Sequence, residues 1–126
     1  MKTQWEKRVD ITILVYQYLL LETEKLEIIN DAITNYDFDA DQTKVLEYIC
    51  DNKQELIDLV APFLDPTWTW ERISYMDRAI ILEAIAEHRT LNTEKSIIID
   101  QALITAKNYN VDNNYKYINA ILDKVI

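Results

Sequence analysis

Glycine is absent from this chain of 126 residues, and that absence excludes two kinds of nucleotide site. Gly-rich phosphate loops and dinucleotide-binding turns need a residue without a Cβ atom, because the backbone must approach the ligand closely. Tight two-residue β-hairpins also lose the residue that they favour. The only prolines are Pro62 and Pro66, so long stretches free of helix breakers stand on either side of them. The composition therefore predicts helices.

Cysteine and histidine each occur once. Cys50 cannot form an internal disulfide, which fits a reducing compartment, and we interpret it as a small buried hydrophobe rather than a reactive thiol. His88 is the one candidate for a histidine dyad or a histidine metal ligand. Its place beside Arg89 is more typical of a helix C-terminus. We therefore predict neither a metal site nor a cofactor.

The carboxylates do not indicate catalysis either. They are numerous but spread over polar helix faces, and the pair Glu83 and Glu87 suits a solvated or partner-binding face better than a desolvated acid–base site. The apolar run at residues 11–21 is interrupted by polar side chains and is too short to cross a bilayer. These features predict a cytoplasmic protein that is neither an enzyme nor bound to a membrane.

Positive charge is scarce in one part of the chain. The formal net charge is −9, and residues 27–65 alone carry two lysines against ten acids, or −8. Residues 1–26 are neutral overall and residues 66–126 carry −1. Nonspecific affinity for nucleic acid comes mainly from cation–phosphate contacts, so the middle third should repel RNA and DNA. Any nucleic-acid surface must therefore use the two ends of the chain.

Apolar residues recur at three- and four-residue steps almost throughout, which is the pattern of helices with one buried face. Residues 79–86 form the strongest case, because only Glu83 among them is polar, and such a helix belongs at the centre of a domain. In the other helices the expected inward positions are Trp5, Val9, Thr12, Ile13, Tyr16 and Leu20; Leu26, Ile29, Ile33 and Tyr36; Val45, Ile49, Leu56, Val60 and Phe63; Ile99, Leu103 and Ala106; and Val111, Tyr115, Ile118, Leu122 and Val125.

Polar residues in front of these apolar runs predict where the helices begin. The expected N-caps are Thr23, Asp39 or Asp41, Ser74 in capping-box spacing, and Thr93. Asp65 followed by Pro66 is expected to start a short helix that carries two of the tryptophans. The sequence thus predicts one all-α domain, residues 1–126, of about seven helices joined by short loops.

The aromatic residues raise the question of base stacking. Tyr115 lies on the apolar stripe of the last expected helix, and Tyr117 is about 200° further round, so we expect Tyr117 to point outward beside Lys116. An exposed aromatic side chain next to a lysine is a modest nucleic-acid signal. The three tryptophans are expected to serve packing instead: Trp5, Trp68 and Trp70.

Three ordered segments carry a resemblance to a known family. They read WERI followed by MDRAIILEAIAE at residues 70–73 and 76–87, IIDQALITAKNY at residues 98–109, and KYINAILDK at residues 116–124. In order and spacing they resemble the C-terminal half of bacterial NusB proteins. The resemblance implies two packed helical subdomains and a role in transcription antitermination. It also implies binding to single-stranded boxA-type RNA of nascent ribosomal RNA transcripts, together with the ribosomal protein NusE, in the transcription elongation complex.

The family's RNA surface combines an arginine-rich start of the first helix with the entry to the last helix. The first part is eroded here, because Gln4, Trp5 and Glu6 stand where basic residues are expected. Fewer cations mean fewer phosphate contacts, so we expect weak RNA binding in the absence of the partner. The resemblance assigns RNA binding to Arg8, Asn113, Lys116, Tyr117 and Asn119, and we expect Lys2 and Lys7 to compensate partly for the missing cations.

The NusE-facing positions implied by the resemblance are Tyr16, Glu71 and Asp77. Acids there suit a basic ribosomal protein, since complementary charge accelerates and orients docking. Asp77 also has a purely structural interpretation as the acid of a capping box, and one residue can serve both roles. An alternative remains open: a divergent relative that keeps the fold as a protein-interaction module without RNA binding. The N-terminal loss of charge favours that alternative, whereas Lys116 and Tyr117 favour RNA binding.

Overall fold

The computed structural model describes residues 1–109 and 115–126, and these residues contain no strand. The predicted all-α class is confirmed. About seven helices were expected, whereas the described residues form six α-helices and two short 3₁₀ helices. The elements are α1 (Gln4–Leu21), α2 (Lys25–Asn35), α3 (Ala40–Val60), η1 (Ala61–Phe63), η2 (Trp70–Arg72), α4 (Tyr75–Leu91), α5 (Lys95–Tyr109) and α6 (Lys116–Val125).

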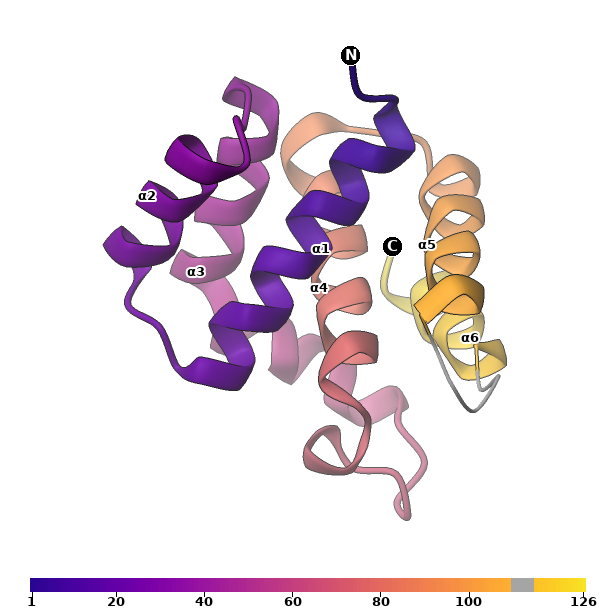
Figure 1. Ribbon diagram of the computed structural model, residues 1–126. Coiled ribbons are helices and arrows are strands. Elements are labelled where there is room, and N and C mark those ends of the chain that lie inside the picture. The colour runs from indigo at the N-terminus through magenta and orange to yellow at the C-terminus, as the bar shows by residue number, and fades with distance from the viewer. Residues whose placement is uncertain (110–114) are drawn as a thin grey trace.

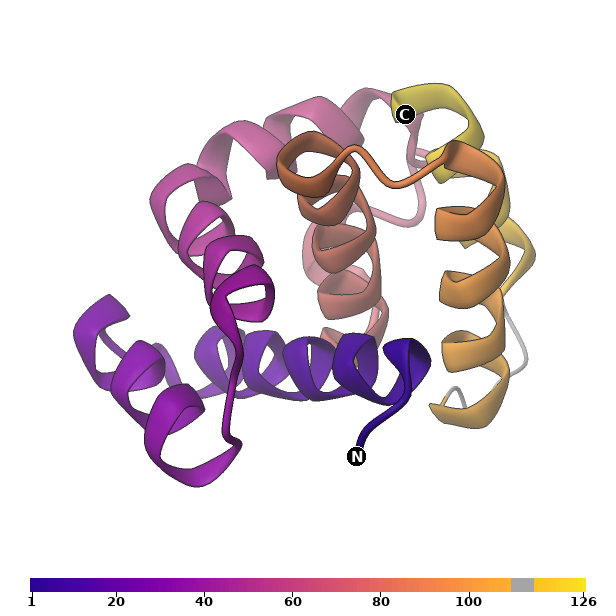
Figure 2. The same ribbon diagram turned by 90° about the horizontal axis from the view of Figure 1, so that it is seen from above.

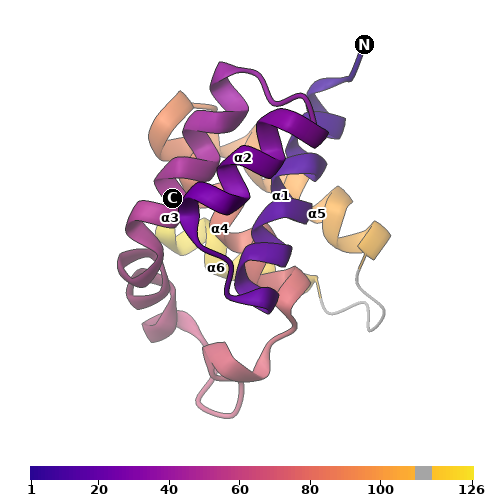
Figure 3. The same ribbon diagram turned by 60° about the vertical axis from the view of Figure 1, so that its left-hand side comes forward.

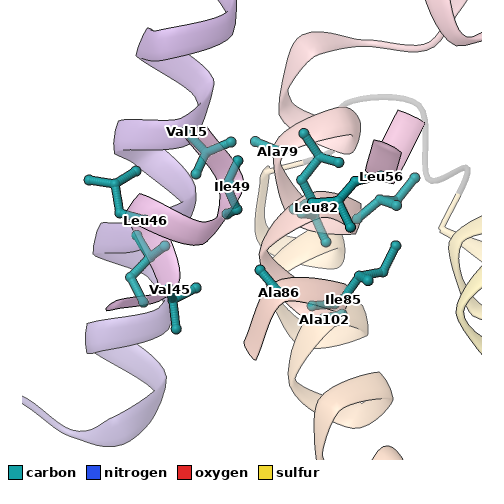
Figure 4. Packing of buried hydrophobic residues seen from close by; sticks show 14 of the residues in the cluster. Val15, Val45, Leu46, Ile49, Leu56, Ala79, Leu82, Ile85, Ala86 and Ala102 are labelled. Carbon is teal, nitrogen blue, oxygen red and sulfur yellow. The ribbon is translucent and has the colours of Figure 1, made fainter. Parts of the chain in front are cut away.

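Helix α4 is the centre of the bundle, as its apolar circumference predicts. It packs against α1 and α3 on one side and against α5 and α6 on the other, an arrangement visible in Figures 1 and 2. Every residue from 79 to 87 is buried. A close view shows how Leu82 and Ile85 of α4 lie among side chains of the neighbouring helices, including Leu56 of α3 (Figure 4). Shortening such a side chain to alanine costs about 2–5 kcal/mol.

Local signals set several helix starts. Asp39 caps α3 and accepts from the backbone N–H of Gln42, and Ser74 caps α4 by accepting from the N–H of Asp77. Both caps were predicted. The prediction at Thr23 is wrong, because α2 begins after Glu24, which makes no side-chain cap bond.

The expected helix start at Asp65 is also wrong. The Asp65 carboxylate accepts from the backbone N–H of Thr67 at 2.8 Å and from its hydroxyl at 2.6 Å. This is a turn in which a side chain takes the place of a backbone acceptor. Helical geometry resumes only at Trp70, in η2. Trp70 is buried as expected, whereas Trp68 is 51% exposed, contrary to the packing role predicted for it.

The inward face of α2 differs from the prediction. Ile28 and Ala32 are buried, whereas Leu26 is 81% and Ile33 is 52% exposed. The reason is that α2 lies on the outside of the bundle, mainly against α3, as Figures 1 and 3 show. Only one of the two apolar stripes of α2, the one with Ile28 and Ala32, is therefore buried against the bundle. Leu20 of α1 and Phe63 of η1 were likewise expected inside and are exposed.

The lack of glycine has a visible cost in the backbone. Three residues adopt left-handed conformations that glycine would adopt without strain: Glu22 with φ 52°, Asp37 with φ 53° and Asn92 with φ 57°. Asn and Asp tolerate this region because their short polar side chains bond locally. Glu22, the C-cap of α1, has no such advantage.

Candidate functional site

The three N-terminal cations of the predicted RNA surface are all paired within the chain. Lys2 forms an ion pair with Asp10. The Nζ atom of Lys7 lies 3.0 Å from the carboxylate of Asp39, the N-cap of α3. These two pairs are partly exposed, so each contributes little to stability. They nevertheless reduce the positive potential that this end of α1 offers to a phosphate.

Arg8 is the most deeply held of the three. Its Nε atom donates to both carboxylate oxygens of Glu87, at 2.9 and 3.1 Å, and its Nη1 atom donates to Gln101 at 3.2 Å. The Arg8 side chain is only 17% exposed and that of Glu87 only 4%. Arg8 therefore joins α1 to both α4 and α5. The Nε–H group is shared between the two carboxylate oxygens, and such charge-assisted hydrogen bonds are stronger than neutral ones.

Glu83 and Glu87 do not lie on a solvated or partner-binding face, and that prediction is wrong. Both are buried, with exposed fractions of 5% and 3%. Because helices surround α4, its polar positions are enclosed along with its apolar ones. Glu83 is one turn from Glu87 and borders a cavity of about 10 Å³ that Arg8, Thr12, Gln101 and Thr105 also line. Its Oε2 atom has no hydrogen-bond partner among the described residues.

The two buried carboxyl groups differ in their contact with positive charge. The Glu87 carboxylate lies 2.9 Å from the Arg8 guanidinium. Burial, followed by the charge and hydrogen bond of Glu87, raises the pKa of Glu83 well above its ordinary value. Two carboxylates this close in a low-dielectric setting cannot both ionise without a large cost. We assign this cluster of Arg8, Glu83 and Glu87 a structural role.

Tyr117 does not point outward as predicted. Its ring is half-buried, and its hydroxyl donates a hydrogen bond to the carboxylate of Asp77. Burial, together with that bond, raises the pKa of Tyr117. Helix α6 is covered on more than one side because it packs against α3, α4 and α5. Tyr115 is half-buried as well. The Nζ atom of Lys107 lies 5.0 Å from the centroid of the Tyr115 ring, in a cation–π contact.

Two other predicted RNA positions remain accessible at the entry to α6. Lys116 and Asn119 are exposed and three residues apart, so they share one helix face. Lys116 makes no ion pair with any described residue. Asn113, also predicted to contact RNA, lies outside the described residues. Among residues 115–126, the entry to α6 thus offers the exposed Lys116 and the amide of Asn119 beside the half-buried Tyr117.

The predicted partner positions have different surroundings. Glu71 is exposed in η2, and Tyr16 is half-buried on α1. Asp77 is only 4% exposed; its backbone N–H bonds to Ser74 and its carboxylate to Tyr117. The backbone N–H of Asp77 takes part in the predicted cap at Ser74, and its side chain is held by Tyr117 of α6. The structure thus brings a predicted partner residue and a predicted RNA residue into direct contact.

Arg78 is an organising residue that the sequence did not single out. Its guanidinium lies 4.3 Å from the Tyr75 ring and 5.8 Å from the Trp70 ring. It also donates to the backbone carbonyls of Ile73 at 3.1 Å and Glu71 at 2.6 Å. These contacts hold the segment before α4. The exposed aromatic side chains of this segment are Trp68 and Tyr75.

The lone cysteine and histidine have structural surroundings. Burial raises the pKa of the Cys50 thiol to about 11, so it is protonated at neutral pH and unreactive as a nucleophile. His88 lies in the last turn of α4 and bonds through Nδ1 to the Thr93 carbonyl at 2.8 Å. Among residues 1–109 and 115–126, no group of three potential ligands could hold a metal ion. No helix in the same residues is long and apolar enough to cross a membrane.

Comparison with known proteins places these features in a family. Residues 10–126 match the NusB family. The transcription antitermination protein NusB of Acetivibrio thermocellus is 33% identical over 121 residues, covering 90% of this chain and 81% of that protein. The NusB of Borreliella burgdorferi is 28% identical over 114 residues, covering 89% and 76%. The solved structure of T. maritima NusB superposes with a TM-score of 0.81 at 27% identity, covering 99% of this chain and 92% of that one. This chain belongs to the NusB family.

Proposed function

We propose that this protein is a transcription antitermination factor that binds boxA-type RNA of nascent ribosomal transcripts together with the ribosomal protein NusE. It acts in the cytoplasm by contact within the transcription elongation complex and catalyses no reaction. Its RNA affinity alone is weak, and useful affinity arises in the complex with NusE. The family membership supports the first part of this proposal. The ion pairs of α1 support the second.

The observation that carries the weak-affinity part is the pairing of all three N-terminal cations. Lys2, Lys7 and Arg8 face Asp10, Asp39 and Glu87 respectively. A cation that already has a carboxylate partner releases fewer counterions when a phosphate approaches, and the ion pair must first be broken. Lys116 at the entry to α6 is exposed and makes no ion pair with any described residue, so it is available to a phosphate. A second RNA-binding surface from the partner compensates for this deficit.

The partner surface is proposed to use Tyr16 and Glu71. Asp77 is buried and contributes indirectly, through the residue that it contacts. Glu71 is exposed and acidic, so it suits the rim of an interface with a basic protein, where charge governs the association rate. Asp77 contributes through its contact with Tyr117. A NusE subunit docked near the start of α4 would therefore lie next to Tyr117 and Lys116.

A second function has one observation in its favour. If the ion pairs of α1 persist in the complex, the chain works as a protein-interaction module that binds NusE but not RNA. The buried Arg8 contact favours this version, because moving Arg8 to a phosphate would leave Glu87 as an unpaired buried charge.

The deciding experiment is a titration of fluorescent boxA-like RNA, with and without NusE, at several salt concentrations. We expect weak binding alone, with a shallow dependence on salt, and much tighter binding with NusE. Asp10→Asn together with Gln4→Arg frees Lys2 and adds a cation. This variant should steepen the salt slope by about 0.7 for each added contact on a single strand. Gln54→Arg together with Asp58→Asn, two exposed changes on α3 that alter the net charge by the same +2, is the control for added charge. Tight binding by NusE with no RNA binding under any condition would favour the interaction module.

A further inference from the structure

The strongest feature that the proposed function leaves unused is a groove beside α2 and α3. It has a volume of about 640 Å³, within the range of ligand-binding pockets. None of the residues predicted to bind RNA or NusE lines it. Its walls come from the end of α2, the segment before α3, one face of α3 and the last turn of α4. The lining residues are Ile33, Phe38, Asp39, Ala40, Thr43, Lys44, Glu47, Tyr48, Asp51 and Thr90.

We propose that this groove binds a short amphipathic helix of a basic partner protein. Its length fits such a ligand: the α3 residues that line it run from Ala40 to Asp51, which is about three helical turns or roughly 16 Å. A helix laid in a groove is recognised through apolar anchors spaced by three, four and seven residues. Three turns supply three such anchors.

Apolar side chains are available to receive those anchors. Ile33 is 52% exposed and lies against the groove. Leu26 is 81% exposed and precedes Ile33 by seven residues, so the two lie on one stripe of α2. Tyr48 provides aromatic surface in the wall, to which Phe38, only 8% exposed, adds little, and Arg89 fixes the Tyr48 hydroxyl with a hydrogen bond of 3.0 Å. Exposed apolar stripes with a polar margin mark interaction sites.

The charge of the groove selects the kind of partner. Three acids line it against one lysine: Asp39, Glu47 and Asp51 against Lys44. The surrounding residues 27–65 carry −8. The acids pair with Lys7 and Lys25, but all of these side chains are at least 30% exposed, so such pairs are weak and open to competition. Asp37 and Asp41, next to the lining residues in sequence, form no ion pair with any described residue.

The same charge argues against the other occupants. RNA would bring phosphates to a groove lined by three acids and one lysine, within a segment (residues 27–65) of net charge −8. A second copy of this chain would bring an identical acidic face, because a two-fold interface uses the same patch twice. No strand among the described residues offers an edge for strand addition. A helix with lysine or arginine beside its apolar stripe satisfies both the shape and the charge of the groove.

The test uses the full chain, labelled with ¹⁵N, and three synthetic 14-residue peptides. The first places leucines at spacings of four and three residues with flanking lysines. The second has the same composition in a permuted order that destroys the stripe, and the third replaces lysine with glutamate. We expect chemical-shift changes from the first peptide at Ile33, Thr43 and Tyr48, and at least tenfold weaker binding of the other two.

Matched variants locate the contact. Ile33→Asn is expected to weaken the first peptide at least tenfold, whereas Ile104→Asn, a comparable exposed change on α5, should leave binding unchanged. Tyr117→Ala should also leave it unchanged, which separates this inference from the proposed RNA function. The proposal is overturned if the permuted peptide binds equally well or the changes map elsewhere. It is also overturned if no localised shifts appear, or if dilution without peptide shifts the same residues, which would indicate self-association.

Discussion

The hydroxyl of Tyr117 donates its hydrogen bond to the carboxylate of Asp77, across forty positions of sequence. This contact ties the first turn of α6 to the first turn of α4, the two places where the NusB resemblance puts RNA and partner contacts. A half-buried tyrosine thus replaces the exposed stacking residue that helical periodicity predicts. The relationship also makes the ring and the hydroxyl of Tyr117 separable by mutation.

Replacing Tyr117 with Phe removes the donor and keeps the ring. Asp77 is 4% exposed, and loss of a partner for a buried acceptor costs about 1–3 kcal/mol. We expect the free energy of unfolding to fall by an amount in that range, while RNA binding in the NusE complex is largely retained. Tyr117→Ala should also lose about 1–3 kcal/mol of stacking. Urea denaturation and RNA titration of both variants measure the two effects, and equal RNA affinity for Phe and Ala would remove Tyr117 from the RNA surface.

The pKa of Glu83 makes stability depend on pH. Because burial raises this pKa above its ordinary value of 4.5, the folded state holds a proton that the unfolded state loses. The stabilising contribution is complete below about pH 4.5 and declines as pH rises toward the folded-state pKa. Glu83→Gln keeps a neutral side chain at all pH values. We expect urea denaturation to show a smaller decline in stability above pH 4.5 for this variant, while exposed Glu94→Gln behaves as the parent does.

Arg8 and Lys7 are neighbours with different expected roles. Arg8→Ala leaves Glu87 buried without its cation, and breaking such a pair costs about 3 kcal/mol or more. Lys7→Ala removes a partly exposed pair that is worth about 0–1 kcal/mol. Thermal denaturation should therefore separate the two variants clearly. Similar stabilities would mean that the contact of Arg8 with Glu87 and Gln101 does not hold α1 in place.

Glu22 offers a stabilising substitution. Its left-handed conformation, with φ 52°, costs a residue with a Cβ atom about 1–2 kcal/mol. Glycine avoids this cost, but it loses more conformational entropy on folding, which offsets part of the gain. We expect Glu22→Gly to raise the free energy of unfolding by about 0.5–1 kcal/mol. The matched change Glu27→Gly, at an exposed position inside the first turn of α2, should lower it instead, because glycine is unfavourable within a helix. A decrease for both variants would show that strain at this corner is negligible.

The features that sequence predicts well are those that neighbouring residues determine. The caps at Asp39 and Ser74 depend on side chains reaching an N–H three residues away, and the burial of α4 follows from its own apolar circumference. The inward stripe of α2 could not be predicted in this way. That helix has one apolar stripe at Ile28 and Ala32 and another at Leu26 and Ile33, and only its contact with α3 decides which is covered.

The candidate site was harder to predict for the same reason. Glu83 and Glu87 appear polar and solvated in a local pattern, because the counter-charge comes from Arg8, seventy-nine positions before Glu87. One signal was available in the sequence. Glu83 and Glu87 are the only polar residues in a stretch, 79–87, that is otherwise apolar on every side, and this indicates that the two acids are buried. Tyr117 was misplaced because a two-residue offset from a buried tyrosine implies exposure only when a helix has one covered face, and α6 has more than one.

The central position of α4 has a consequence for synthesis. A chain that leaves the ribosome N-terminus first completes α1, α2 and α3 before residues 75–91 exist. Val15 and Ile49 are fully buried in the finished protein and stay partly uncovered until α4 is made. Arg8 likewise has no bond to Glu87 or Gln101 until those residues have been synthesised. The first three helices therefore cannot mature as an independent unit. Nascent chains that stop short of α4 are expected to leave the facing sides of α1 and α3 uncovered.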